Sequence, residues 1–253
     1  MSLAANLARI HQQMADACRR AHRPDSGVAL MAVSKMHPAE AMIEAYAAGQ
    51  RLFGENRVQE WQEKLSVLQS LFSSSPSAQD PCAQDPLTAQ VHLIGPLQSN
   101  KTGKAAELFD AIDAVDSLKI ATRLNAAALT LSKKLPILIE VKLSHEESKH
   151  GILPAELPTL LAALAPLESL VPCGLMTVPP WSQSEDAETA RPYFRELRRL
   201  RDASLPACPT LTQLSMGMSN DFGVAIEEGS TCVRIGTAIF GKRRYPPAAP
   251  AQE

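Results

Sequence analysis

The sequence predicts a (β/α)8 barrel, in which eight parallel strands close into a sheet surrounded by helices. Short segments rich in Val, Ile and Leu alternate with helical patterns along the 253 residues. Such alternation indicates βαβ units, and eight of them in about 250 residues is the size at which a parallel sheet closes. An open doubly wound sheet would want a glycine-rich turn after the first strand, and residues 34–38 contain no glycine.

The predicted strands are short and apolar on successive residues, as expected for strands buried on both faces. They span residues 28–34, 51–54, 91–95, 110–115, 136–142, 171–176, 211–215 and 231–235. Apolar residues at helical spacing predict helices between them. These span residues 39–48, 58–71, 117–133, 156–164, 185–201 and 221–228.

The two ends of the chain and one internal segment lie outside this alternation. Leu3, Leu7, Ile10 and Met14 share one face of a predicted N-terminal helix, which lacks the uninterrupted apolar centre of a secretory signal. Residues 73–86 are polar and rich in proline, which predicts a surface loop. We expect residues 1–242 to form the barrel domain and residues 243–253 a flexible C-terminal tail.

The composition excludes several classes of function. A formal charge of −2, from 25 basic and 27 acidic residues, creates no global field for nucleic acid or an anionic membrane. The apolar runs are too short to span a bilayer. The five cysteines are odd in number and widely spaced, which favours reduced thiols in the cytoplasm and no metal site. The expected partner is a small molecule.

Lys35 is the most informative residue, because it ends the apolar run of the first predicted strand. A cation there either caps the strand into solvent or lies in a dry pocket that favours the neutral, nucleophilic amine. In a barrel of this class, the loops after strands seven and eight commonly hold phosphate. A lysine amine and a phosphate-binding cradle at one end of the barrel together fit pyridoxal 5'-phosphate.

The loops after the seventh and eighth strands have the composition of such a cradle. Gly217 permits close approach of the backbone, and Ser219 is placed to cap a helix that begins near Asn220. Gly236 and Thr237 supply further amides and a hydroxyl after the eighth strand. An ordinary turn with a helix cap explains either segment alone, whereas their joint occurrence in these two loops favours a phosphate site.

Three further polar residues have two readings each. Arg234, inside the eighth strand, either forms an ion pair with a nearby carboxylate or contacts the pyridine nitrogen of the cofactor. Asn56, after the second strand, either bonds the phenolic oxygen of the cofactor or caps the next helix. His92 begins the third strand and is predicted to be structural rather than catalytic.

Motifs in order along nearly the whole chain resemble those of the pyridoxal phosphate homeostasis proteins, the YggS/PROSC family. They lie at residues 32–35, 53–60, 92–101, 146–151, 174–176, 214–219 and 229–241. Three features depart from the family pattern: Arg57 stands where an aromatic residue is frequent, His37 occupies a variable position after the lysine, and the insertion at residues 73–86 is longer than usual. None removes a proposed cofactor contact.

The resemblance implies a barrel like the N-terminal domain of alanine racemase, with the cofactor held as a Schiff base on Lys35. Arg234 would then face the pyridine nitrogen, with Asn56 and Met176 near the ring. The residues implied around the phosphate are Ser215, Met216, Gly217, Ser219, Gly236 and Thr237. The family implies intracellular vitamin B6 homeostasis without established catalysis, and pyridoxal phosphate-dependent apoenzymes are the expected recipients. A monomer is expected, because no second domain offers an obvious dimer interface.

Two enzymatic alternatives remain. A pyridoxal phosphate-dependent amino-acid racemase needs a second acid–base group opposite Lys35. Tyr46 and Tyr193 fall within predicted helices, and Tyr245 lies in the predicted tail, so no tyrosine is well placed for that role. A Schiff-base aldolase acting on a sugar phosphate is the other alternative, although its lysine would usually lie on a middle strand.

Overall fold

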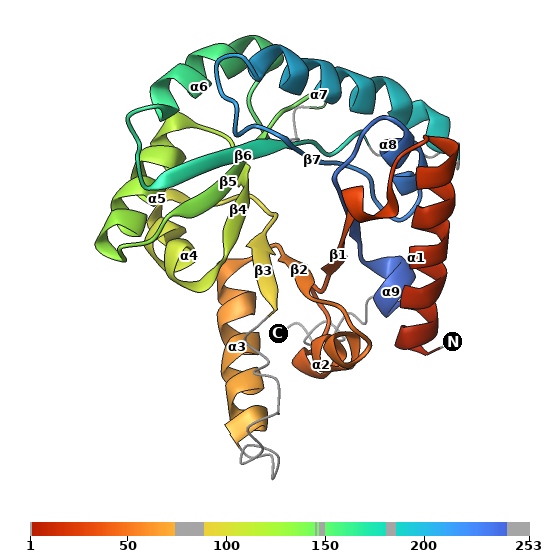
Figure 1. Ribbon diagram of the computed structural model, residues 1–253. Coiled ribbons are helices and arrows are strands. Elements are labelled where there is room, and N and C mark those ends of the chain that lie inside the picture. The colour runs from red at the N-terminus through yellow and green to blue at the C-terminus, as the bar shows by residue number, and fades with distance from the viewer. Residues whose placement is uncertain (1, 74–88, 145, 147–149, 181–185, 242–253) are drawn as a thin grey trace, which may run out of the picture.

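The computed structural model confirms the closed parallel barrel (Figure 1). It describes residues 2–73, 89–144, 146, 150–180 and 186–241. The strands pair in chain order, and β1 pairs with β8 to close the sheet. They are β1 (Ala29–Val33), β2 (Leu52–Glu55), β3 (Gln90–Leu93), β4 (Ala111–Val115), β5 (Leu135–Glu140), β6 (Leu170–Met176), β7 (Gln213–Ser215) and β8 (Cys232–Ile235).

Helices form the outer layer around this sheet (Figure 1). They are α1 (Leu3–Arg20), α2 (Ala39–Ala47), α3 (Val58–Ser73), α4 (Thr102–Leu108), α5 (Leu118–Thr130), α6 (Leu157–Leu164), α7 (Arg191–Ser204), α8 (Phe222–Glu227) and α9 (Thr237–Phe240). The prediction omitted α4 and α9, because Gly103 weakens the helical signal of the first and the second is a single turn. The helix predicted from residue 185 begins as α7 at Arg191, with a proline in its first turn.

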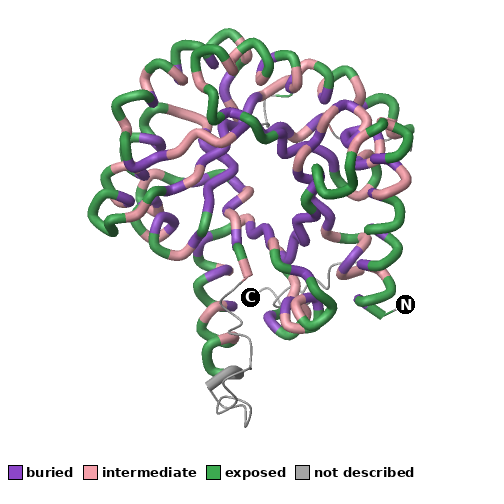
Figure 2. Tube along the Cα trace, viewed as in Figure 1, coloured by how far each residue is buried: buried purple, intermediate pink, exposed green. Residues whose placement is uncertain are grey.

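The core lies between the sheet and the helices. Strand residues that face outward, such as Phe53, Leu93 and Ile137, are fully buried against the helical layer (Figure 2). Helix α1 covers part of the barrel by burying the predicted stripe of Leu3, Leu7, Ile10 and Met14. Because strands in such a sheet are buried on both faces, their successive residues are apolar in the sequence.

The strand residues of the opposite face line the inside of the barrel, where polar groups are frequent. Leu138 lies between the outward-facing Ile137 and Ile139, and forms a separate small cluster with Ala114 and Met176. Ionisable side chains occupy the same interior, among them His92, Asp113 and Arg234. A polar interior in a closed sheet indicates a position for a functional site.

Several predicted features have a defined outcome in the described residues. Cys18, Cys173, Cys208 and Cys232 are free thiols, and Cys18 and Cys232 are buried. No helix in these described ranges is long and apolar enough to cross a bilayer. The predicted tail at residues 243–253 lies outside the described residues, as does the predicted loop at 73–86 apart from Ser73, which ends α3.

Candidate functional site

Lys35 lies in the turn that follows β1, at the carboxyl end of the barrel strands. The backbone of Gly236, directly after β8, packs against the end of β1, since a Cβ added to Gly236 would lie 3.2 Å from the carbonyl oxygen of Val33, two residues before Lys35. The rings of His37 and Phe240 stack with their centroids 5.0 Å apart. The structure therefore brings the Lys35 loop and the loop after β8 together.

The loop after β7 requires glycine at position 217. Gly217 has a φ of 97°, and a Cβ there would lie 2.5 Å from the Cβ of Ala225 in α8. Its carbonyl oxygen accepts a hydrogen bond from the Arg234 N–H at 2.9 Å. Within the part of the chain that the structure describes, the N–H groups of Gly217 and Ser219 donate to no other group. They are therefore free to bind an anion.

The predicted role of Ser219 as a helix cap is wrong. Helix α8 begins at Phe222, and its N-cap residue is Asp221 rather than Ser219. The Asp221 carboxylate accepts a hydrogen bond from the N–H of Met218, which closes one extra turn before the helix. The loop after β7 is consequently longer than a simple strand-to-helix connection.

The other residues predicted to surround the phosphate divide into two groups. Gly236 is the N-cap of α9 and Thr237 its first residue, and neither N–H donates a hydrogen bond within the described ranges. Met216, in contrast, donates its N–H to the carbonyl of Cys232 at 3.1 Å and buries its side chain in the outer core. Met216 therefore offers a ligand neither its N–H nor its side chain.

Arg234 is held inside the barrel by three hydrogen bonds. Its guanidinium donates to the carbonyl and the hydroxyl oxygen of Ser215, at 2.6 and 2.7 Å, and to the carbonyl of Thr177 at 2.7 Å. Among the described residues no carboxylate lies within ion-pair distance, so the predicted ion pair is not formed. Burial lowers the pKa of Arg234, although nearby charges, including Asp113, oppose the shift. The cation is oriented by neutral acceptors.

Asn56 has a buried side-chain oxygen without a hydrogen-bond partner among the described residues. This observation excludes a side-chain cap on α3, the second reading of Asn56. A buried acceptor without a donor is rare in native proteins and indicates a missing ligand or water. The backbone at Asn56 packs closely on Gly95 after β3, where a Cβ would lie 2.4 Å from the Asn56 carbonyl oxygen.

Met176, at the end of β6, is completely buried. It contacts Ala114 and Leu138 inside the barrel rather than the helical layer. Met176 therefore forms part of the apolar wall on the β4 to β6 side of the interior.

His92 and Asp113 form a polar pair across β3 and β4. The Nδ1 atom of His92 lies 3.1 Å from Oδ1 of Asp113. Burial lowers the pKa of His92, but the charge and the hydrogen bond of Asp113 outweigh it, and the pKa is raised overall. A polar residue within the apolar β4 segment was the sequence signal for Asp113, which the prediction did not use.

The pH dependence of stability tests this pair. Because the His92 pKa is higher in the folded state, the imidazolium stabilises the fold fully below about pH 6.5, and this contribution is lost as the pH rises through the folded-state pKa. We expect His92→Gln to lower the free energy of unfolding by about 1 kcal/mol on the acidic side and to leave it nearly unchanged at alkaline pH. Urea unfolding from pH 5.5 to 9 measures this, and equal destabilisation at every pH would contradict it.

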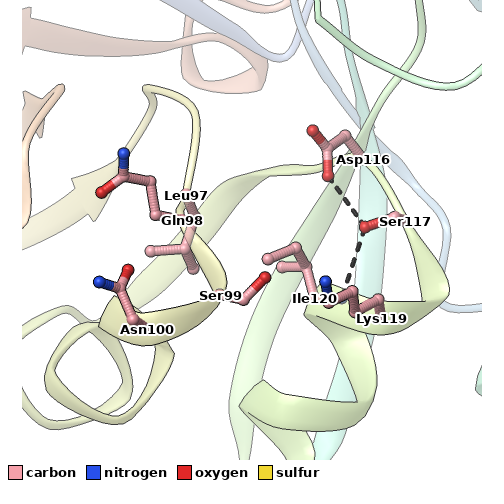
Figure 3. A pocket seen from close by; sticks show the side chains of 8 residues that line it. All are labelled: Leu97, Gln98, Ser99, Asn100, Asp116, Ser117, Lys119 and Ile120. Atoms are coloured by element: carbon pink, nitrogen blue, oxygen red, sulfur yellow. Dashed lines mark hydrogen bonds between the residues drawn. The ribbon is translucent and has the colours of Figure 1, made fainter.

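A pocket of about 560 Å³ lies beside the strand ends (Figure 3). Its walls come from the loop after β3, the loop after β4 and the first turn of α5, and the lining residues are Leu97, Gln98, Ser99, Asn100, Asp116, Ser117, Lys119 and Ile120. No lining residue comes from the loops after β1, β7 or β8, so this pocket is distinct from the Lys35 cradle.

Comparisons with known proteins identify the family. The family model "Alanine racemase, N-terminal domain" matches residues 5–244. A pyridoxal phosphate homeostasis protein of Pasteurella multocida is 42% identical over 97% of this chain and 99% of its own length. One from Escherichia coli is 41% identical over 96% of this chain and 97% of its own. This chain belongs to the pyridoxal phosphate homeostasis protein family.

Solved structures agree with this family assignment. One of them is PipY of Synechococcus elongatus with PLP bound, which is 39% identical to this chain with a TM-score of 0.78. The match covers 95% of this chain and 100% of PipY. An alanine racemase of Clostridium difficile shares 14% identity with a TM-score of 0.69, over 98% of this chain and 58% of the racemase. The second likeness concerns the fold, and confirms the racemase-like barrel predicted from the family motifs.

The site residues predicted from the sequence do not include every polar residue around the site. Glu55 ends β2 with an entirely buried carboxylate, and Lys64 of α3 donates to it at 2.7 Å. Ser230 donates its hydroxyl to the carbonyl of Met216 at 2.8 Å and supports the loop after β7. The available sequence signal for the Glu55–Lys64 pair was a lysine at a core-facing position of α3. Thr177 and Ser230 act through hydrogen bonds that involve main-chain atoms, which sequence patterns do not report.

Proposed function

We propose that this protein binds pyridoxal 5'-phosphate as a Schiff base on Lys35 and serves as a carrier of the cofactor. The observation that supports the proposal is the close approach of Gly236, after β8, to Val33 at the end of β1, two residues before Lys35, together with N–H groups after β8 that donate no hydrogen bond within the described ranges. The partnerless oxygen of Asn56 supports it, because the site contains a buried acceptor that a bound ligand would satisfy. The homeostasis relatives are named for the same cofactor.

Each residue has a distinct role in this proposal. Lys35 would hold the aldehyde carbon of the cofactor through its amine nitrogen, and the N–H groups of Gly217, Ser219, Gly236 and Thr237 would hold the phosphate. Bound pyridoxal phosphate supplies an electrophilic carbon and a ring that accepts electrons.

The ring contacts in the proposal come from the interior of the barrel. Arg234, oriented by Ser215 and Thr177, faces the pyridine nitrogen, and its permanent charge keeps that nitrogen unprotonated. Asn56 accepts a hydrogen bond at the polar edge of the ring, and Met176 packs near it. An unprotonated nitrogen weakens the ring as an electron sink, which favours storage over carbanion chemistry.

The carrier reading is favoured over a racemase by the positions of the tyrosines. Tyr46 lies in α2, where its ring contacts the guanidinium of Arg51, and Tyr193 lies in α7. Both are in the outer helical layer rather than in the loops at the strand ends. Tyr245 lies outside the described residues. A two-base racemase needs an acid–base group on each face of the substrate carbon. Lys35 is proposed for one face, and no residue is proposed for the other.

A pair of assays on the loaded protein distinguishes the two readings. A carrier is expected to restore activity to a pyridoxal phosphate-dependent apoenzyme, and to leave L-alanine unchanged when the products are separated by chiral chromatography. Accumulation of D-alanine at a rate proportional to the concentration of loaded protein would support the racemase instead. Failure to reactivate the apoenzyme would contradict the carrier proposal.

The proposal also covers the oligomeric state and the cellular compartment. We propose a monomer that acts in the cytoplasm, where its four described free cysteines stay reduced, and that delivers the cofactor to apoenzymes. Size-exclusion chromatography with light scattering measures the monomeric state. A stable dimer would contradict that part of the proposal without affecting cofactor binding.

A further inference from the structure

A buried charged cluster lies directly behind the turn that carries Lys35. Glu55 at the end of β2 and Lys64 in α3 form an ion pair with a distance of 2.7 Å, and both side chains are buried. Lys64 also contacts Glu60, one helical turn earlier, at 2.8 Å. Burying the charges of Glu55 and Lys64 between a sheet and a helix is costly compared with apolar packing, so such a cluster calls for a specific role.

The cluster bonds to the peptide groups on both sides of Lys35. Lys64 Nζ donates to the carbonyl oxygen of Ser34 at 2.8 Å, and the Ser34 hydroxyl donates to Glu55 at 2.7 Å. On the other side, the N–H of Met36 donates to the carboxylate of Glu60. The residue before Lys35 and the residue after it are therefore both tied to α3.

The backbone beyond Lys35 needs this support. Met36 has a φ of 62°, in the left-handed region that residues other than glycine rarely adopt, and its side chain is exposed rather than packed in the core. The hydrogen bond to Glu60 ties the N–H of Met36 to α3. It adds to the main-chain hydrogen bond from the His37 N–H to the Ser34 carbonyl oxygen, which closes the turn at 3.0 Å.

We infer that Lys64, acting with Glu55 and Glu60, positions Lys35 for Schiff-base formation by fixing the backbone on both sides of it. This inference rests on the proposed function of Lys35. The three residues lie on the outer face of the sheet and contact the turn rather than the cofactor. They act by orientation: the amine must meet the aldehyde carbon at bonding distance, and a shift of the turn would move it away.

The electrostatics of the cluster agree with this arrangement. Burial raises the pKa of Glu55, and Lys64 and Ser34 oppose the shift with a charge and hydrogen bonds. Burial also acts to raise the pKa of Glu60, but the hydrogen bonds from Lys64 and the Met36 N–H outweigh it, so the pKa is lowered. Lys64 therefore opposes protonation of both acceptors, against the effect of burial.

The test is the rate at which the Schiff-base absorption band appears when pyridoxal 5'-phosphate is added to the apoprotein. We expect Lys64→Met to slow this rate at least about tenfold. The amount of cofactor that stays bound without borohydride treatment should remain within about twofold of the wild-type amount. Lys104→Met is the matched control, because Lys104 is on the surface of α4 and pairs only with the exposed Glu107 among the described residues. It should load at the wild-type rate.

Variants at the partly exposed Glu60 keep the inference testable if Lys64→Met does not fold. Glu60→Leu removes the acceptor for the Met36 N–H and should slow loading about tenfold, whereas Glu60→Gln retains an oxygen acceptor and should stay within about threefold of the wild type. Folded Lys64→Met or Glu60→Leu protein that loads at the wild-type rate would overturn the inference. Absence of a band in the wild type would instead overturn the proposed function itself.

Discussion

Replacing Lys35 with alanine is expected to abolish the visible absorption band that the wild-type protein develops with pyridoxal 5'-phosphate. Lys35 supplies the amine that bonds to the aldehyde carbon, and alanine has no nucleophile. The band should fall at least about tenfold, while some cofactor remains bound through the phosphate contacts of the loops after β7 and β8. Absorption spectra before and after borohydride, together with total cofactor retained on ultrafiltration, measure both effects.

A second lysine controls for the loss of a surface amine. Lys104→Ala removes an exposed side chain of α4 and should leave the band unchanged. If Lys35→Ala protein kept a full band that borohydride removes, another lysine would carry the cofactor and the proposed site would be wrong. If both variants and the wild type lacked the band, the aldolase-like alternative would have to be reconsidered.

Adding one methyl group at Gly217 is expected to have the largest effect on stability. The new Cβ would lie 2.5 Å from the Cβ of Ala225 and 3.0 Å from the Cα of Phe222, and φ at this position is 97°. Left-handed strain and overpacking each cost about 1–3 kcal/mol, so Gly217→Ala should lower the free energy of unfolding by about 3 kcal/mol. Cofactor affinity should fall as well, because the loop after β7 must move.

Gly103 in α4 gives a control with the same change of atoms. A Cβ at Gly103 meets nothing within 4 Å, and the residue lies inside a helix. Gly103→Ala should therefore stabilise the protein by up to about 1 kcal/mol. Urea unfolding of the two variants compares them directly. Equal effects of the two substitutions would show that the Gly217 loop tolerates a side chain and would contradict its assigned geometry.

The barrel could be predicted because its physical requirements appear locally in the sequence. A strand buried on both faces must be apolar on successive residues, and this property identified all eight strands within a few residues of their observed ends. The omitted helices lack such a signal. Helix α4 contains Gly103, and α9 has only one turn between Thr237 and Phe240.

The candidate site was predictable where a rule of the fold applies. Lys35, Gly217 and Gly236 follow strands one, seven and eight, and parallel strands bring their carboxyl ends to one side of the barrel. Contacts between elements that are distant in sequence were not predictable. Arg234 is held by main-chain carbonyls, and Lys64 meets Glu55 only because α3 packs back on the sheet.

Mapping the covalent attachment after borohydride reduction is the most direct test of the central claim. The wild-type protein is incubated with pyridoxal 5'-phosphate, reduced, digested and analysed by mass spectrometry. We expect one predominant adduct of pyridoxal phosphate mass on the peptide that contains Lys35, at close to one equivalent per chain. Adducts spread over several surface lysines, or no adduct on Lys35 in a protein that binds the cofactor, would contradict the account.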